Sequence, residues 1–374
     1  MEIPFVNHTF DQSDALKSSY VLAPFLYPRQ LPDDAVLEVK ALSQGTTNAL
    51  FKVSRQTIDL TAGSAVLVKV YGDGTEITID RDKEIRVHKL LAEKQLSSFP
   101  LVRFLNGHGY EFIPGVPCSD HDIRKERVWR GIARELARWH VTLPAVTHDD
   151  PEKILNFESS IWSTAKRWLD AISAQPRRST ATKDSLRDGF AFLTQKLLFS
   201  HTIPNTMVLG HGDLLSGNII IQESSHGEVA AVRFIDYEHA TYCPRAFEIA
   251  NHFAEWAGFN CDYNSLPTRN TRREFIHEYL KASAEFERAK PSEVAESEID
   301  ELMGQVDAFR GFPGFYWGLC ALIQAEESTG TIDFDYSGYA EKRLAEYSAW
   351  RKGEEGILQV GEELPLREKI WASP

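Results

Sequence analysis

The chain has 374 residues, and this length favours about two folded lobes over a single hydrophobic core. A hydrophobic content of 43% with 11% aromatic residues is enough for a packed interior and excludes a predominantly disordered chain. The formal net charge is −13, from 41 basic and 54 acidic residues without a basic patch, so nucleic acid is a poor partner whereas a cationic substrate is compatible.

Cysteine usage and the N-terminal sequence bear on the cellular compartment. Cys118, Cys243, Cys261 and Cys320 are far apart and match neither a CxxC nor a zinc-site spacing, which predicts free thiols in a cytoplasmic protein. The first 20 residues have neither a basic nor an apolar segment of the signal-peptide type, and no apolar run reaches the length of a membrane span. We therefore expect a cytoplasmic protein without a membrane span.

The first part of the sequence is rich in strand patterns. Residues 1–34 contain three prolines that predict an irregular arm on the surface. Residues 36–54 give two β-rich runs joined by the small-residue loop 43–48, and residues 65–72 form a further strand that carries Lys69 among apolar neighbours. Taken alone, the loop is an ordinary hairpin turn, and Lys69 is the solvent-facing residue of a one-sided strand.

A helix and a second pair of strands complete this part of the chain. The segment 80–94 places apolar residues at helical spacing and contains Glu84, a candidate partner for Lys69. Residues 101–116 predict two strands that end at Pro114-Gly115, a hinge between two lobes. The remainder is mainly helical, with predicted helices at 126–140, 157–173, 182–199, 271–288, 295–309 and 338–350, and a peripheral tail at 352–374.

Three polar residues stand at the ends of strand-like segments between these helices. Asp213 and Asn218 precede the β-branched run 219–221, and a second apolar run, 232–235, ends at Asp236. If the two runs pair as a hairpin, Asn218 and Asp236 reach the same end of the ribbon, because the chain reverses direction between them. An isolated His-x-Asp sequence is common by chance, whereas this joint pattern is much less so.

This set of side chains is the one that phosphoryl transfer from ATP requires. A carboxylate must accept the proton of the attacking hydroxyl, and Asp213 is the candidate. Amide and carboxylate oxygens must hold Mg²⁺ against the phosphates, and Asn218 and Asp236 match the one or two protein ligands that this ion usually takes. The sequence thus predicts an ATP- and Mg²⁺-dependent kinase.

The motifs that carry these residues resemble those of a known family. HGDLLSGNIII at 211–221, FIDYEHA at 234–240 and EIANHFAEW at 248–256 resemble the choline/ethanolamine kinase family, within the wider group of aminoglycoside-phosphotransferase-like enzymes, and over the whole chain most of all the ethanolamine kinases of filamentous fungi. The resemblance implies an α+β, bilobal, protein-kinase-like fold. We expect a β-rich nucleotide-binding lobe over residues 1–114, including the arm 1–34, and a mainly helical catalytic lobe over residues 115–374.

The resemblance also implies roles for individual residues. The loop residues Gly45, Thr46, Thr47 and Asn48 would lie over ATP. Lys69 would contact the phosphates and pair with Glu84, although the family usually has arginine at this position. Backbone groups from Glu111 to Ile113 would face adenine. His211 would hold the catalytic loop by hydrogen bonding, and Glu238, two residues beyond Asp236, would support the metal directly or through water.

Substrate choice depends on the pocket for the amine. By resemblance, Glu255 lies near the substrate ammonium group, with Trp317 and Tyr339 as walls, although an aromatic stripe at helical spacing is by itself more often core. Choline kinases carry a second tryptophan where this chain has Cys320, and their long insert is absent from residues 71–84. These differences favour ethanolamine, phosphorylated to phosphoethanolamine as the first step of the CDP-ethanolamine route to phosphatidylethanolamine.

Other interpretations stay open from the sequence. A kinase of choline or of another small amino alcohol is the nearest alternative. An antibiotic or sugar phosphotransferase is disfavoured, because those enzymes lack the NHFAEW and FYWGL segments together. A catalytically dead ATP-binding scaffold is disfavoured because Asp213, Asn218, Asp236 and Lys69 are all present. The resemblance also leaves a homodimer open.

Overall fold

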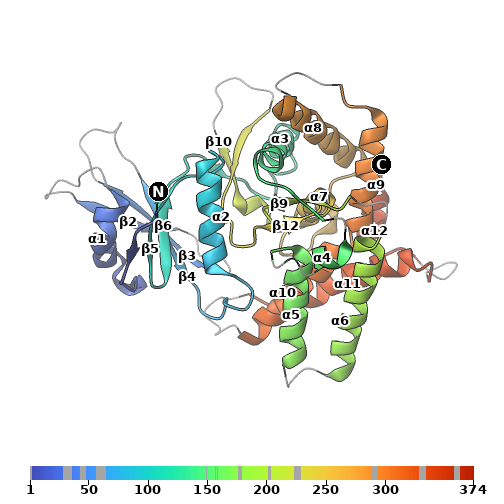
Figure 1. Ribbon diagram of the computed structural model, residues 1–374, viewed down its shortest axis with the longest axis horizontal. Coiled ribbons are helices and arrows are strands. Elements are labelled where there is room, and N and C mark those ends of the chain that lie inside the picture. Colours follow the sequence, from blue (N-terminus) through green and yellow to red (C-terminus); the bar gives the residue numbers. More distant parts are fainter. Residues whose placement is uncertain are drawn as a thin grey trace. The chain divides into compact units, whose positions relative to one another are not determined.

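The computed structural model divides the chain into two compact units (Figure 1). Unit 1 comprises Met1–Pro114 with Glu327–Phe334, and unit 2 comprises Gly115–Glu326 with Asp335–Pro374. A short segment from late in the chain therefore belongs to the first unit. The structure describes residues 2–27, 36–42, 48–55, 65–148, 150–155, 157, 159–175, 179–200, 204–222, 229–288, 293–327, 334–357 and 363–374.

Unit 1 is built on a six-stranded sheet with the strand order β1-β5-β6-β4-β3-β2. Its central strand β4 is buried along nearly its whole length, which explains its almost continuous apolar sequence. Every neighbouring pair is antiparallel except β1 with β5. The strands are β1 (Phe5–Val6), β2 (Leu37–Ala41), β3 (Asn48–Arg55), β4 (Val66–Tyr71), β5 (Pro100–Phe104) and β6 (Gly107–Glu111).

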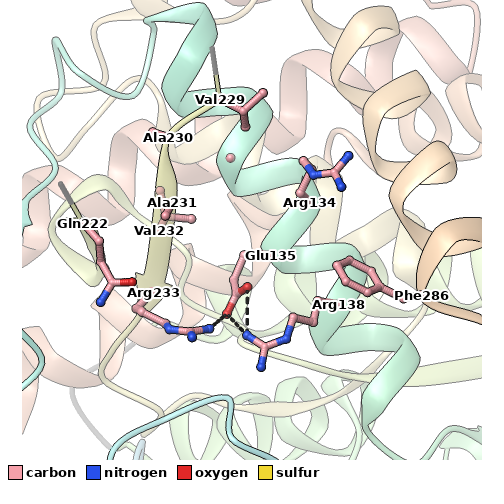
Figure 2. A pocket seen from close by; sticks show the side chains of 11 residues that line it. Arg134, Glu135, Arg138, Gln222, Val229, Ala230, Ala231, Val232, Arg233 and Phe286 are labelled. Carbon is pink, nitrogen blue, oxygen red and sulfur yellow. Dashed lines mark hydrogen bonds and ion pairs between the residues drawn. The ribbon is translucent and has the colours of Figure 1, made fainter. Parts of the chain in front are cut away.

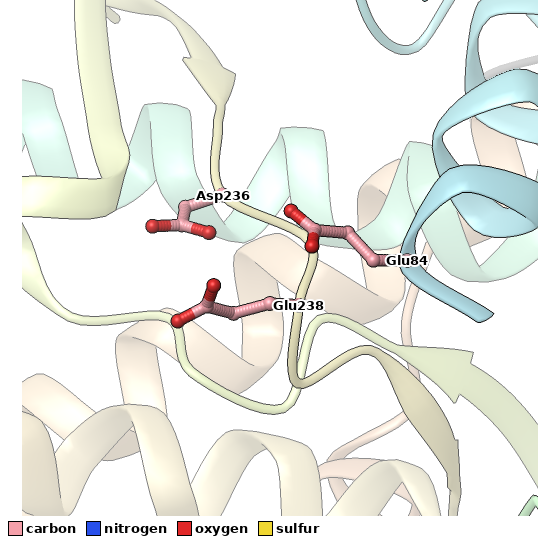
Figure 3. A group of neighbouring side chains, drawn as sticks. All are labelled: Glu84, Asp236 and Glu238. Carbon is pink, nitrogen blue, oxygen red and sulfur yellow. The ribbon is translucent and has the colours of Figure 1, made fainter. Parts of the chain in front are cut away.

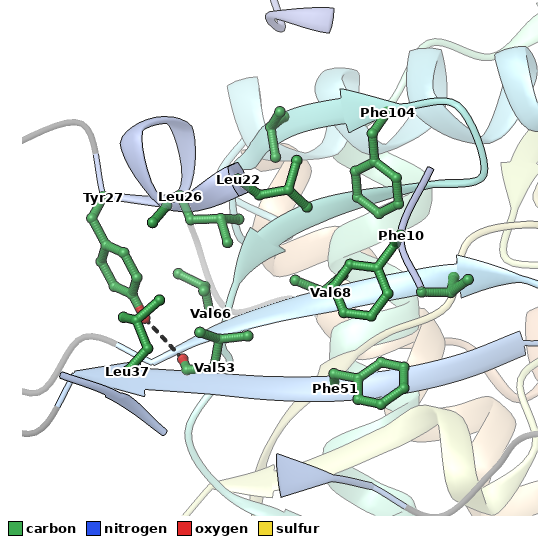
Figure 4. Close-up of a cluster of buried hydrophobic side chains, with 13 residues drawn as sticks. Phe10, Leu22, Leu26, Tyr27, Leu37, Phe51, Val53, Val66, Val68 and Phe104 are labelled. Atoms are coloured by element: carbon green, nitrogen blue, oxygen red, sulfur yellow. Dashed lines mark hydrogen bonds between the residues drawn. The ribbon is translucent and has the colours of Figure 1, made fainter. Parts of the chain in front are cut away.

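The prediction of an irregular arm over residues 1–34 is wrong, because α1 (Ala15–Leu26) is a regular helix. Its apolar face packs on the sheet with Leu22 and Leu26 fully buried, and the hydroxyl of Tyr27 donates to the carbonyl of Val53 at 2.9 Å (Figure 4). Pro24 lies in the last turn, where the loss of one backbone donor costs little against this burial. The arm is therefore part of the core of unit 1.

Helix α2 (Arg81–Glu93) is the second helix of unit 1, and its sequence fixes its start. The Asp80 side chain accepts from the N–H of Lys83 at 2.9 Å. Two acidic residues follow in the first turn, where their negative charge interacts favourably with the positive end of the helix dipole. Its inner face buries Glu84, Ile85 and Leu91. The helix thus carries Glu84 on the side that packs inside the unit.

Unit 2 is mainly helical. The long amphipathic helix α3 packs against α8, and arginines of α3 pair with glutamates of α8 along their contact. The helices are α3 (Glu126–Thr142), α4 (Pro151–Leu155), α5 (Ile161–Ala174), α6 (Thr180–Leu193) with a π-helical turn at Thr194–Leu198, α7 (Arg245–Glu255), α8 (Arg269–Arg288), α9 (Glu296–Phe309), α10 (Phe312–Glu327), α11 (Tyr336–Glu354) and α12 (Leu366–Ala372).

Unit 2 also contains two small sheets, and the predicted residues Asp213, Asn218 and Asp236 lie in the segments next to their strands. One has the order β11-β10-β7 and the other the order β12-β9-β8. β10 and β11 pair antiparallel with Ile219 opposite Phe234, so the predicted hairpin is confirmed. The strands are β7 (Val116–Pro117), β8 (Val146–Thr147), β9 (Thr206–Gly210), β10 (Ile219–Gln222), β11 (Ala231–Phe234) and β12 (Thr241–Cys243).

The C-terminal tail is not peripheral, contrary to the prediction for residues 352–374. Helix α11 extends to Glu354, and α12 buries the indole of Trp371, over which the guanidinium of Arg272 lies at 4.1 Å. Arg272 also donates to the Trp371 carbonyl at 2.8 Å. The tail is thus fastened to α8 by an aromatic anchor. In the part of the chain that the structure describes, no helix combines the length and the apolarity needed to span a bilayer.

Candidate active site

The segment between β9 and β10 forms a loop that carries two of the predicted site residues. It leaves β9 at Gly210 and ends in a short 3₁₀ turn, Ser216–Asn218. Gly212 adopts a φ of +79°, and a Cβ there would lie 2.3 Å from the carbonyl oxygen of His239. Glycine is therefore needed at this position both for the backbone conformation and for the close approach of the two segments.

His211 joins this loop to the segment that carries Asp236. Its Nε2 lies 2.9 Å from the carbonyl of Ile235, and its Nδ1 accepts from the N–H of Asp213 at 3.4 Å. Burial lowers the pKa of His211 to about 4, so the ring is neutral and can donate from one nitrogen while it accepts at the other. The predicted role of His211 in holding the loop is confirmed by these contacts.

Asp213 and Asn218 lie directly against each other. The Asn218 amide nitrogen donates to the carbonyl of Asp213 at 2.8 Å and to its carboxylate at 3.1 Å. Burial raises the pKa of Asp213 well above its usual range, and the nearby carboxylates of Glu255, Asp236 and Glu238 raise it further. A carboxyl group poised closer to neutral pH is better suited to accept and return a proton than an ordinary aspartate.

Asp236 follows β11 in a left-handed conformation, with a φ of +66°. Aspartate tolerates this region better than most residues, and such strain is often found at functional sites. The preceding residue is fixed by its N–H, which donates to the Asn218 carbonyl at 2.9 Å. A carboxylate oxygen of Asp236 lies within 4.8 Å of one from Glu238 (Figure 3). The structure therefore gathers Asp213, Asn218, Asp236 and Glu238 in one region of unit 2.

One face of α7 holds the backbone on both sides of Asp213. Glu248 accepts from the N–H groups of His211 and Gly212 at 2.9 and 3.2 Å. Asn251 donates to the Gly212 carbonyl at 2.9 Å, and His252 Nδ1 lies 2.8 Å from the carbonyl of Leu214.

These three α7 residues were not predicted to contact the loop 211–218. Their polar i, i+3, i+4 spacing within a buried helix was the available signal.

The predicted amine-pocket residues come from three helices of unit 2. Glu255 ends α7 and lies 3.4 Å from the guanidinium of Arg343. Trp317, on α10, donates its indole N–H to Asn251 at 2.9 Å. Tyr339, on α11, is buried, and the Arg343 guanidinium lies 5.8 Å from its ring centre. Burial raises the pKa of Glu255, which Arg343 partly offsets.

The predicted nucleotide-binding residues belong to unit 1. Lys69 on β4 and Glu84 on α2 form a buried ion pair at 2.7 Å, so the expected pairing is present. Glu111 ends β6 and is exposed, whereas Ile113 is half-buried. Asn48 opens β3 and is buried. Gly45, Thr46 and Thr47 lie outside the described residues.

A separate hollow of about 360 Å³ lies between α3, β11 and the ring of Phe286 (Figure 2). Glu135 lies between two arginines there, with Arg233 at 2.8 Å and Arg138 at 3.2 Å. None of the predicted site residues that the structure describes lines this hollow.

Solved structures with similar chain traces define the class of fold. A crystal structure of choline kinase from Cryptosporidium parvum is 17% identical with a TM-score of 0.68, and covers 93% of this chain and 98% of its own. A GDP complex of an aminoglycoside 2'-phosphotransferase is 14% identical with a TM-score of 0.51, and covers 90% of this chain and 99% of its own. These matches confirm the predicted α+β, protein-kinase-like fold of small-molecule phosphotransferases.

Sequence relatives define the family within that class. The Choline/ethanolamine kinase family model matches residues 39–348. Human ethanolamine kinase 2 is 33% identical over 350 residues, which are 92% of this chain and 83% of that protein. The probable ethanolamine kinase of Arabidopsis thaliana is 32% identical over 327 residues, which cover 84% of this chain and 80% of that protein. The chain belongs to the choline/ethanolamine kinase family.

Proposed function

We propose that the protein transfers the γ-phosphoryl group of ATP to the hydroxyl of ethanolamine. The hydroxyl oxygen forms the new bond to phosphorus, the bond to the ADP oxygen breaks, and the hydroxyl proton passes to Asp213. The products are phosphoethanolamine and ADP. The observation that carries this proposal is the gathering of Asp213, Asn218 and Asp236 through one hairpin, in a chain whose relatives bear the name ethanolamine kinase.

Asp213 is the proposed general base. Its raised pKa makes its carboxylate a stronger base than an exposed aspartate, and the hydrogen bond from Asn218 keeps that carboxylate in a fixed orientation. His211 and α7 fix the backbone from which it projects. These contacts support a group that is held for proton transfer before the substrate arrives.

The donor set beside Asp213 fits magnesium. The amide nitrogen of Asn218 donates to Asp213, so its Oδ1 is the atom available to a metal. Asp236 and Glu238 supply carboxylate oxygens. All three are the hard oxygen ligands that Mg²⁺ prefers. When bound, the ion would neutralise phosphate charge and orient the triphosphate. The carboxylates of Asp213, Asp236 and Glu238 repel one another electrostatically without a cation, and this repulsion adds to the effect of burial, which raises the pKa of Asp213.

Unit 1 supplies the proposed nucleotide contacts. Lys69, held by Glu84, would contact the phosphates, and the loop 45–48 would cover them. Backbone groups between Glu111 and Ile113 would face adenine. The buried Lys69–Glu84 pair supports this assignment, because a kinase lysine needs a carboxylate that holds it at a fixed position.

The amine pocket supports ethanolamine over choline. Glu255 would accept hydrogen bonds from a primary ammonium group, with Trp317 and Tyr339 as walls. Cys320 stands where choline kinases carry a second indole, and the smaller side chain makes a weaker cage for trimethylammonium. The four buried free cysteines also support the cytoplasm as the site of the reaction, because thiols stay reduced there.

A coupled ADP-release assay on ethanolamine, choline and their methylated intermediates tests the proposal. We expect the largest kcat/KM with ethanolamine, and loss of ADP release in Asp213→Asn with ATP binding retained. A preference for choline would contradict the assignment of the amine pocket. Measurable ATP binding without ADP release from any amino alcohol would favour a catalytically dead scaffold.

A further inference from the structure

We propose that Asn251 is a positioning residue that connects the amine pocket to the general base. Through this connection, the size of the bound amine affects the rate of phosphoryl transfer. The inference rests on the proposed function. Asn251 is fully buried on α7, between Trp317 and the catalytic loop. It accepts the Trp317 indole N–H at 2.9 Å and donates to the Gly212 carbonyl at 2.9 Å.

The chemistry of the two partners fixes the orientation of this amide. An indole N–H can only donate, so the Asn251 oxygen must face Trp317. A backbone carbonyl can only accept, so the Asn251 nitrogen must face Gly212. Both partners are matched in one orientation, and a flipped amide would lose both hydrogen bonds. Asn251 therefore links Trp317 to Gly212 through a single rigid group.

The Gly212 carbonyl belongs to the peptide unit that leads into Asp213. Asn251 holds the oxygen of that peptide, and the ring of His211 accepts from its N–H at 3.4 Å. Gly212 has a φ of +79° and no side chain, so the backbone at this position can rotate more freely than it could at another residue. The orientation of the Asp213 carboxylate thus depends on the two hydrogen bonds that hold its preceding peptide.

Trp317 is also the proposed wall of the amine pocket. A bulky amine that displaces the indole would pull on Asn251, and through it on the peptide before Asp213. A small primary ammonium group would leave the link in place. Discrimination against trimethylammonium substrates should therefore lower kcat as well as raise KM, because the base moves out of position in the complex.

Two substitutions separate the link from the wall. Trp317→Phe keeps an aromatic face and removes the N–H donor together with the five-membered part of the indole. Asn251→Asp keeps the acceptor for Trp317 and, when the new carboxyl group is ionised, replaces the donor to Gly212 with an oxygen. Losing one buried hydrogen bond between these groups should lower kcat for ethanolamine by about tenfold to a hundredfold. We expect KM for ethanolamine to change by less than about threefold.

The matched control is Trp162→Phe. Trp162 is another fully buried tryptophan, and among the described residues its indole nitrogen has no hydrogen-bond partner. The same substitution there should leave kcat within about twofold of the wild type. The double variant Trp317→Phe/Asn251→Asp should be only slightly less active than the less active of the two single variants. Both substitutions interrupt the same connection between Trp317 and Gly212.

The results either support or overturn the link. A lower kcat in both single variants, non-additive in the double variant, supports it. A raised KM with unchanged kcat in Trp317→Phe overturns it, as do additive losses. If a variant melts below the assay temperature, replacing the Trp317 indole N–H by sulfur in benzothienylalanine provides the same deletion in a ring of the same size. A wild type that phosphorylates neither ethanolamine nor choline overturns the proposed function itself, and the link with it.

Discussion

Glu248 should make the stability of unit 2 fall as pH rises. Its carboxyl group is fully buried and accepts the backbone N–H groups of His211 and Gly212. Burial raises its pKa from 4.5 to about 7, against the opposing effect of these hydrogen bonds. A carboxyl group with a raised folded-state pKa keeps its proton between pH 4.5 and 7 while the unfolded chain loses its own. Stability from this group is therefore present at low pH and is lost across that interval.

The size of the effect follows from the same pKa. Each unit of pKa corresponds to about 1.36 kcal/mol, so a change from 4.5 to about 7 is worth about 3 kcal/mol in the free energy of unfolding. Glu248→Gln has nearly the same shape and can still accept from both N–H groups, but it does not ionise. The stability of the variant relative to the wild type should thus grow by about 3 kcal/mol between pH 4.5 and pH 8.

Urea unfolding of both proteins at several pH values measures this difference. Other groups with raised pKa values, such as Asp213, are common to both proteins and cancel in the comparison. An exposed glutamate provides the control, and Glu341→Gln should follow the wild type at every pH. A stability difference between wild type and Glu248→Gln that stays constant from pH 5 to pH 8 would refute the argument.

The remaining predictions concern turnover, metal and the core of unit 1. With Asp213 as the proposed base, the acid limb of the kcat/KM–pH profile, which reports the free enzyme, should lie above the usual range for an aspartate, because burial raises the pKa of Asp213; profiles between pH 5 and 9 measure this. Asp236→Asn should raise the Mg²⁺ concentration for half-maximal activity, measured by titration. Lys69→Met should cost less than the ~3–5 kcal/mol of a fully broken buried pair, because Arg81 still pairs with Glu84 at 3.2 Å, and adding Glu84→Gln should restore part of the loss in urea unfolding. Phe10→Ala should cost about 3–5 kcal/mol in the same assay, because its ring is buried in the core cluster.

The convergence of Asp213, Asn218 and Asp236 was predictable because it is nearly local. The antiparallel pairing of β10 with β11 reverses the chain between Asn218 and Asp236, so strand pairing alone brings their ends together. Asp213 is only five residues from Asn218, and its amide contact needs no distant element. Patterns of this kind can be read from sequence because few chain conformations satisfy them.

The role of α7 was not predictable from the same reasoning. Glu248, Asn251 and His252 bind backbone groups of the loop, and backbone groups have no sequence signature. The sequence of α7 is moreover typical of an ordinary buried helix with a few polar residues. Only the requirement that buried polar side chains find partners could have pointed to it.

The two errors at the chain ends have a related cause. Pro24 suggested an irregular arm, but burial of the α1 face outweighed one missing backbone donor. The tail from residue 352 has little apolar pattern, and a single indole, Trp371, supplies its anchor. In both places, tertiary packing decided the outcome against a weak local preference.

Three residues around the catalytic loop depend on one another's size. The Glu248 side chain places its Oε2 close to β9. A Cβ on Gly210 would lie 2.4 Å from this oxygen and 2.6 Å from the sulfur of Cys243. Glutamate at 248 is therefore compatible with the loop only because residue 210 has no side chain. The Cys243 thiol, 3.6 Å from the same oxygen, donates to it weakly. The carboxylate that orients the catalytic loop is thus fitted by glycine and cysteine on the strands beside it.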